Sequence, residues 1–318
     1  MKNIYSNIYK ATNNNLNKAK IVIENGGVVA VPTETVYGLA ADAYNKNAVK
    51  KIFSLKKRPN HNPLIIHFKN IEQIKKEAIV NKKFLKLAKK FSPGPLTYIL
   101  KKKKNSKISK LANKGLVSIA VRIPSETNIL NLLNILNCPL AAPSANKSKS
   151  LSPTTAKHVA EEFNGKVQMI IDGGACKIGV ESTVIDLTGK PNILREGGLP
   201  SEVIEKFLKT KLSKNKNKVI KSPGQIGLHY SPGMPIYMNR NKAIKDGALI
   251  TFANKSYGNK NVFNLSTKGI LKEAANNFFN ILRIIKNKKF KSISVNKIPN
   301  KDLGKAINER LRRAAQYE

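Results

Sequence analysis

The first 208 residues alternate between short apolar runs and longer stretches in which apolar residues recur every three or four positions. Val28 to Val31 is one such run, ended by Pro32, and Leu64 to Phe68 is another. Between them, Ala48 and Ile52 lie one helical turn apart. This alternation of strand and helix patterns predicts an α/β fold in which helices cover a sheet.

Further elements follow the same two patterns. Ser152 followed by Pro153 is typical of a helix start, because Ser caps the first turn and Pro fits the first helical position. We expect further strands at 96–100, 117–121, 167–171 and 183–187, and further helices at 16–23, 84–91 and 127–136.

The composition changes at Lys209, and this change divides the chain. Residues 209–221 are rich in Lys, Asn and Ser and contain little to bury, which predicts a linker. A segment punctuated by Pro and Gly covers Ser222 to Pro235, and a second α/β pattern begins at Ile236. The expected organisation is a domain at 1–208, a linker at 209–235 and a small domain at 236–318, with strands at 248–252 and 292–295 and helices at 271–285 and 303–315.

The formal net charge of +39 does not by itself identify a partner. Of the 58 basic residues 50 are Lys, and the excess is spread along the chain, +20 over residues 1–208 and +19 over residues 209–318. The frequencies of Lys and Asn are both high, which indicates a coding bias that places these residues on solvent-exposed faces. An evolved RNA-binding surface is the alternative, and either would attract polyanions.

Cys138 and Cys176 are the two cysteines, too few for a disulfide framework or a zinc-ligand spacing. No apolar run approaches the roughly 20 residues of a membrane span, and Met1 to Lys10 lacks the apolar stretch of a signal peptide. We therefore expect a cytoplasmic protein with no membrane partner.

Two motifs near the N-terminus combine hydroxyls and cations where the chain leaves predicted strands. In PTETVYGLAAD, Thr35 follows a strand end, which is where open α/β sheets bind ligands. In SLKKRPNHNPLIIHF, Lys56 and Arg58 precede a Pro-limited loop, a placement that suits phosphate oxygens, and His67 lies in the next strand. The alternatives are hydroxyls satisfied within a turn, lysines on a solvated face and a structural histidine.

Two further motifs place polar residues on a strand and before a predicted helix. In VSIAVRIP, Ser118 and Arg122 share one face of a strand, and such an arginine can bind a carboxylate. An exposed arginine at a sheet edge is the alternative. In APSANKSKSLSPTT, Ser144, Asn146 and Ser152 precede a predicted helix, whose N-terminal amides attract anions.

A last motif, GVESTVIDLTGKPNILREGG, contains Ser182 and Arg195. The chain has no Walker loop, no GxGxxG, no HExxH and no nucleophile elbow. Nucleotide binding would therefore use an arrangement outside these motifs.

Taken together, the motifs resemble the threonylcarbamoyl-AMP synthase family in its long two-domain form, with a YrdC-like N-terminal domain. The matching stretches are PTETVYGLAADA, KKRPNHNPL, SPGPLT, VRIP, APSAN and GVESTVIDL, followed by HYSPGMP and GKAINERLRRAA. They occur in the family's order over nearly the whole chain. Two departures are Glu34, where the motif often has Asp, and Asn62, where Ser or Lys is common.

The resemblance implies a YrdC-like twisted mixed sheet around a basic concave cleft, and a small Rossmann-like α/β domain at the C-terminus. It implies a nucleotidyltransferase that converts L-threonine, bicarbonate and ATP into threonylcarbamoyl-AMP and pyrophosphate, with magnesium as the expected ion. A downstream transferase would pass the threonylcarbamoyl group to an adenosine of tRNA. Weak binding of tRNA or double-stranded RNA is also expected.

The resemblance also implies roles for individual residues. No covalent nucleophile is expected, because the carbamate formed from threonine is already anionic. We expect Cys176 to be a packing residue. Threonine is expected to contact Thr35, His67, Arg122 and Ser182, and ATP to contact Lys56, Arg58, Asn62, Ser118, Ser144, Asn146, Ser152, Arg195 and Tyr230.

The segment 222–235 holds His229 and Tyr230 between prolines, which a plain tether would not need. We interpret it as a lid that crosses the cleft, with Tyr230 reaching the nucleotide; an ordered connector is the alternative.

Two other functions compete with this one. The first is an RNA-binding or ribosome-assembly protein that uses the basic cleft without catalysis. The second is a carbamoyl-transfer module of the hydrogenase-maturation type, which would carry zinc-finger cysteines that this chain lacks.

Overall fold

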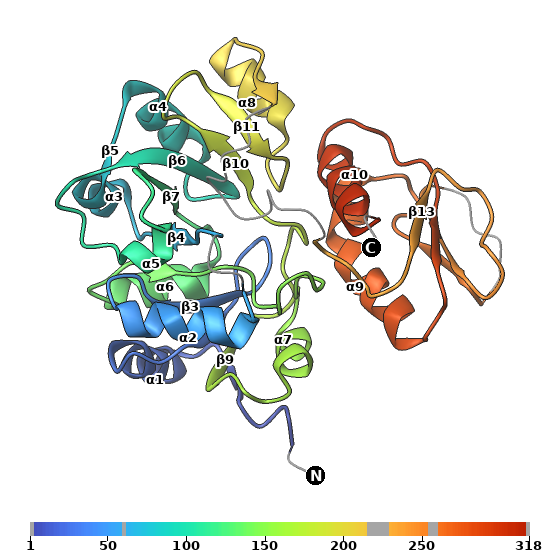
Figure 1. The fold of residues 1–318 in the computed structure, drawn as a ribbon, viewed down its shortest axis with the longest axis horizontal. Helices are drawn as coiled ribbons and strands as arrows, with labels where there is room; N and C mark the ends of the chain where they lie inside the picture. The colour runs from blue at the N-terminus through green and yellow to red at the C-terminus, as the bar shows by residue number, and fades with distance from the viewer. Residues whose placement is uncertain (1–2, 59–61, 215–228, 254–259, 316–318) are drawn as a thin grey trace.

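The computed structural model describes residues 3–58, 62–214, 229–253 and 260–315 (Figure 1). These residues form a large α/β domain and a smaller α/β domain beside it, as the sequence predicts. None of the helices in the described ranges is long and apolar enough to cross a membrane.

The larger domain is built on a mixed sheet of twelve strands within the described residues. The order is β1-β9-β2-β3-β8-β4-β7-β6-β10-β11-β12, with β5 paired to β6. The sheet contains parallel pairs such as β4–β7 and antiparallel pairs such as β6–β7. The strands are β1 Ile8–Lys10, β2 Val29–Val31, β3 Gly38–Asp42, β4 Ile65–His67, β5 Ala78–Ile79, β6 Leu96–Lys102, β7 Ser118–Arg122, β8 Leu140–Ala141, β9 Met169–Asp172, β10 Thr183–Asp186, β11 Asn192–Arg195 and β12 Ser213–Lys214.

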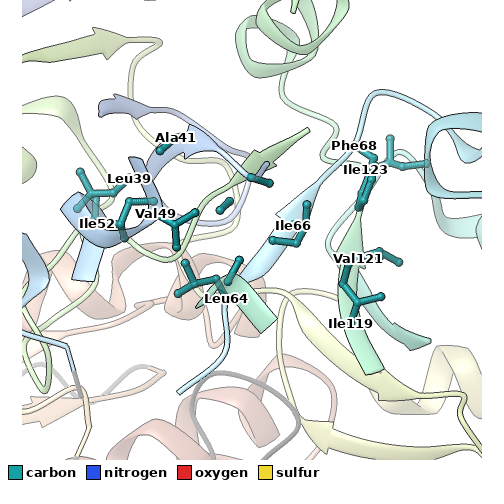
Figure 2. Packing of buried hydrophobic residues seen from close by; sticks show 14 of the residues in the cluster. Leu39, Ala41, Val49, Ile52, Leu64, Ile66, Phe68, Ile119, Val121 and Ile123 are labelled. Carbon is teal, nitrogen blue, oxygen red and sulfur yellow. The ribbon is translucent and has the colours of Figure 1, made fainter. Parts of the chain in front are cut away.

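Helices cover both faces of this sheet, and strand alternation divides the core between them. Val29 and Val31 of β2 pack in one cluster with α1 and α6, whereas Ala30 packs in another with α2. Figure 2 shows part of the second cluster, in which Leu39 lies near Ile52. The helices are α1 Asn13–Glu24, α2 Lys46–Lys56, α3 Ile71–Glu77, α4 Lys82–Phe91, α5 Lys110–Asn113, α6 Thr127–Ile135, α7 Ala156–Phe163 and α8 Ser201–Leu208.

The predicted helix start at Ser152 is wrong. Helix α7 begins at Ala156, and its N-cap is Thr155, whose side chain accepts a hydrogen bond from the backbone N–H of His158. The Ser152 hydroxyl donates instead to the Glu181 carboxylate, and the Pro153 carbonyl accepts from the backbone of the segment before β3. These tertiary contacts hold residues 152–154 outside the helix.

The smaller domain has a four-stranded, all-parallel sheet in the order β13-β16-β14-β15. The predicted strands at 248–252 and 292–295 and the two predicted helices are confirmed within two residues; β13 and β15 were not predicted. The Rossmann-like description stays a prediction. The elements are β13 Ile236–Met238, β14 Ala248–Thr251, β15 Val262–Asn264, α9 Leu271–Asn287, β16 Ile293–Val295 and α10 Leu303–Ala314.

The predicted linker is described only at its two ends, because residues 215–228 lie outside the described ranges. At its start, β12 pairs with β11, so the large sheet continues into the segment predicted to be a tether. At its end, Tyr230 is buried in the core of the smaller domain.

Helices α9 and α10 face the larger domain (Figure 1). Val36, Leu151 and Val180 of the larger domain are buried in the same apolar cluster as the core of the smaller one. The Arg283 side chain in α9 donates to the Leu151 carbonyl at 2.6 Å. The backbone of Gly179 packs directly on α9, where a Cβ would lie 2.5 Å from the Ala275 carbonyl oxygen. The two domains therefore share a packed interface.

We expect the G179A variant to lose more stability than G174A. Both glycines have positive φ, +84° and +81°, so both substitutions carry the same backbone strain, but a Cβ at Gly174 meets nothing within 4 Å. G174A should lower the free energy of unfolding by about 1 kcal/mol, and G179A by about 1–3 kcal/mol more. Equal losses in denaturant unfolding would contradict the close contact with α9.

Candidate active site

A cavity of about 40 Å³ lies where β4, β7, β10 and β11 meet the loops that follow β2 and β8. His229 and Tyr230 line it from the side of the smaller domain. Its charged lining residues are three arginines and one glutamate, Glu181. Eight of the thirteen predicted site residues line it: Thr35, Arg58, His67, Arg122, Ser144, Ser182, Arg195 and Tyr230.

Arg122 is held by three groups of the protein. Its Nη2 lies 2.7 Å from Glu34 Oε1 in a buried ion pair, and its Nη1 donates to Thr35 Oγ1 at 3.0 Å. Its Nε donates to the Gly94 carbonyl at 3.2 Å. The guanidinium is therefore fixed in orientation at the end of β7.

His67 lies beside Arg122, because β4 and β7 pair in parallel register at these two residues. Burial and the charge of Arg122 lower the pKa of His67 to about 3, so the imidazole is neutral at pH 7. Its Nδ1 has no hydrogen-bond partner among the described residues. The cavity wall here offers a neutral polar group next to a fixed cation.

Ser182 and Arg195 form a second polar corner. Ser182 Oγ lies 2.8 Å from Thr97 Oγ1, and Arg195 Nη2 donates to the Ser182 carbonyl at 2.8 Å and to its Oγ at 3.1 Å. The antiparallel pairing of β10 with β11 brings the two together, although they lie 13 positions apart in the chain.

Arg58 lies just after the C-terminal end of α2 and is a buried part of the cavity wall. Its Nε and Nη2 each donate at 3.2 Å, to the carbonyls of Asn62 and Pro63. Burial is the main cause that lowers the pKa of Arg58 to about 10, which leaves it charged at pH 7. These two hydrogen bonds use two of its five N–H groups, so other N–H groups can face a ligand.

Five predicted residues do not line the cavity. Lys56 was expected to face phosphate, but its Nζ donates to the carbonyls of Ser144 and Asn146 and so holds the loop that carries Ser144. Ser118 lies at the other end of β7 from Arg122, roughly 13 Å along the strand at about 3.3 Å per residue. The other three are held by hydrogen bonds outside the cavity lining. The Asn62 carbonyl accepts from Arg58, the Asn146 side chain donates to the Ser150 carbonyl, and the Ser152 hydroxyl donates to Glu181.

Glu181 is a lining residue that the sequence analysis missed. It directly precedes Ser182 in the GVEST motif, and its role depends on partners distant in the chain. Cys176, expected to be a packing residue, is buried in the main apolar cluster.

The lysine excess lies on the surface. Lys56 is the one buried lysine among the described residues, whereas five of the eight arginines are buried. This distribution favours the interpretation that the lysines decorate solvated faces. Most of the buried cations among the described residues are therefore arginines.

Two family models match the chain. One, described as "Telomere recombination", covers residues 21–197, and the other, the C-terminal domain of threonylcarbamoyl-AMP synthase, covers residues 199–316. A threonylcarbamoyl-AMP synthase from Pyrococcus abyssi is 40% identical and covers 93% of this chain and 92% of its own. One from Schizosaccharomyces pombe is 38% identical, with 81% of this chain and 69% of its own covered.

Solved structures agree with these matches. Pyrococcus abyssi Sua5 in complex with L-threonine aligns with a TM-score of 0.90 and 38% identity, covering 97% of each chain. Escherichia coli YciO, 24% identical with a TM-score of 0.52 over 60% of this chain and 94% of its own, shares the fold of the larger domain. The motifs, the two-domain architecture and these matches together place the chain in the threonylcarbamoyl-AMP synthase family.

Proposed function

We propose that this protein makes threonylcarbamoyl-AMP and pyrophosphate from L-threonine, bicarbonate and ATP. The observation that carries the proposal is the cavity in which Arg122, Arg58 and Arg195 converge with hydroxyl groups and a neutral histidine. The substrates bring a carboxylate, a carbamate and a triphosphate, all of which need such donors. The relative solved with L-threonine supports the same assignment.

Threonine binds, in this proposal, at the wall made by Thr35, His67, Arg122 and Ser182. Arg122 takes the carboxylate, because Glu34 and Thr35 already fix its orientation. The neutral imidazole of His67 adds a hydrogen-bonding group without adding charge.

ATP binds on the side of Arg58, Ser144, Arg195 and Tyr230. Lys56, Asn62, Asn146 and Ser152 act indirectly, through hydrogen bonds that hold the loops of the cavity wall. Ser118 lies at the opposite end of β7 from Arg122. The carbamate oxygen attacks the α-phosphorus of ATP and pyrophosphate leaves, so no side chain needs to act as nucleophile. The protein contributes positioning and stabilisation of negative charge.

Magnesium finds no ready-made protein site in the described ranges, where no three His, Cys, Asp or Glu side chains gather. Glu181, the one acid in the cavity wall, is occupied by Ser152 and Arg310. Magnesium in proteins is often held largely by substrate phosphates and water. We therefore propose that it arrives with ATP.

The substrates need more room than this cavity gives. Its volume is about 40 Å³, whereas pockets for small-molecule ligands usually span roughly 300–1,000 Å³. His229 and Tyr230 end the predicted linker and line the cavity, which supports the proposal that segment 222–235 works as a lid. Residues 222–228 of that segment lie outside the described ranges.

The product would pass to a tRNA threonylcarbamoyl transferase in the cytoplasm. The alternative, RNA binding without catalysis, leaves the buried arginines and His67 without a role. Weak RNA binding at the lysine-rich surface remains compatible with the enzyme.

The test is a pyrophosphate-release assay in which each substrate is omitted in turn. We expect release to require ATP, L-threonine and bicarbonate together, and threonylcarbamoyl-AMP to accumulate in step with pyrophosphate. Equal release without threonine would refute the proposal, since a simple ATP pyrophosphatase would give that result.

A further inference from the structure

Arg310 of α10 is the fully buried cation that links the smaller domain to the cavity wall. Its Nε donates to Glu181 Oε2 at 2.9 Å, and its Nη1 donates to the Glu196 carbonyl at 2.7 Å. Its guanidinium also lies 5.4 Å from the centre of the Tyr230 ring. Arg310 itself does not line the cavity, but both Glu181 and Tyr230 do.

Glu181 presents a problem for a nucleotide site. A carboxylate in the cavity wall would repel a triphosphate, and the low dielectric of a buried site would strengthen that repulsion. Burial acts to raise the pKa of Glu181, but the charges of Arg310 and Arg195 outweigh it, and the pKa lies below its ordinary value. Glu181 is therefore ionised at pH 7, and its charge must be balanced.

We propose that Arg310 is a positioning residue for ATP: its guanidinium neutralises Glu181, so that this carboxylate does not repel the triphosphate from the arginines of the cavity wall. This inference rests on the proposed function and adds a task for the smaller domain. Without Arg310, the Glu181 carboxylate would be balanced by Arg195 alone, the other cation that acts on it. Less of the positive charge of Arg195 would then act on the triphosphate. Glu181 also accepts from Ser152, so its orientation is fixed from both domains.

The test measures the dissociation constants of ATP and L-threonine by calorimetry for the wild type and for R310Q, E181Q and the double variant. R310Q should bind ATP about tenfold more weakly or worse, because a buried charge loses its partner. Threonine binding should change less than about threefold. The E181Q substitution in the double variant removes the repelling charge and should restore ATP binding to within about threefold of wild type.

R283Q is the matched control. Arg283 is also a buried arginine that crosses from the smaller domain, to the Leu151 carbonyl and to Glu162 at 3.5 Å, but none of these residues lines the cavity. R283Q should lower the melting temperature and change ATP affinity by less than about twofold.

The outcomes separate this inference from the proposed function. Failure of the wild type to bind ATP would overturn the proposed function. ATP binding by R310Q equal to wild type, or a double variant as weak as R310Q, would overturn the role of Arg310. If R310Q does not fold, the double variant R310Q/E181Q still tests the role of Arg310. It buries no unpaired charge, so it should fold, and the proposal requires it to bind ATP.

Discussion

The R58A variant should release pyrophosphate about a hundredfold to a thousandfold more slowly than the wild type, a loss of about 2.7–4 kcal/mol of transition-state stabilisation. Arg58 lines the cavity, is 8% exposed and carries its charge at pH 7. Negative charge moves from the carbamate to the leaving pyrophosphate during the reaction, and a fixed cation stabilises it most in the transition state.

The fold should survive this substitution. Arg58 belongs to none of the apolar clusters of the core, and its side chain donates to two carbonyls, those of Asn62 and Pro63. Each such bond contributes about 0.5–1.5 kcal/mol to stability. Circular dichroism should therefore show a folded protein with a slightly lower melting temperature.

K57A is the control for R58A. Lys57 is the neighbouring residue, carries the same charge and is exposed at the end of α2. Its removal should leave the rate within about twofold of wild type, because an exposed charge is screened by solvent. If R58A and K57A had the same kinetics, Arg58 would not act on the phosphates.

The α/β architecture could be predicted because its main elements are long enough to carry a pattern. Helix α4, with Phe84, Leu87 and Ala88 buried on one face, and strand β6 both stand out in the sequence. The strands β8 and β12 have two residues each, too few for any periodicity. Their pairing is decided by neighbours distant in the chain.

The candidate site could be predicted in part because its residues lie at or next to strand ends. Register then decides which of them meet: His67 and Arg122 lie side by side, whereas Ser118 is left at the far end of the same strand. Local rules fail where a partner is distant. The Lys56 side chain donates to the Ser144 carbonyl, 88 positions away, and no feature of the motif around Lys56 indicates this.

Arg310 could have been recognised as buried but not as part of the site. Leu303, Ala306, Ile307, Leu311 and Ala314 mark the buried face of α10, and position 310 falls on it, while Arg312 is exposed. Its partner Glu181 is 129 positions away, so the pair becomes visible only when the two domains are packed together.

R122A should raise the threonine KM about tenfold to a hundredfold and leave the ATP KM within about threefold. A hydrogen bond to a charged group contributes about 1.5–3 kcal/mol, and Arg122 is the fixed cation on the threonine side. Initial rates of pyrophosphate release, titrated against each substrate in turn, measure both values. A defect confined to ATP would place Arg122 on the nucleotide side.

The variant has a second effect that must be separated from the first. Removing Arg122 leaves the buried Glu34 without its cation, which destabilises the fold and would also repel the threonine carboxylate. The double variant E34Q/R122A removes this repulsion and should regain stability. Its threonine KM should stay high if Arg122 binds the carboxylate directly. Recovery of the KM in the double variant would show instead that Arg122 acts only by neutralising Glu34, the arrangement we infer for Arg310 and Glu181.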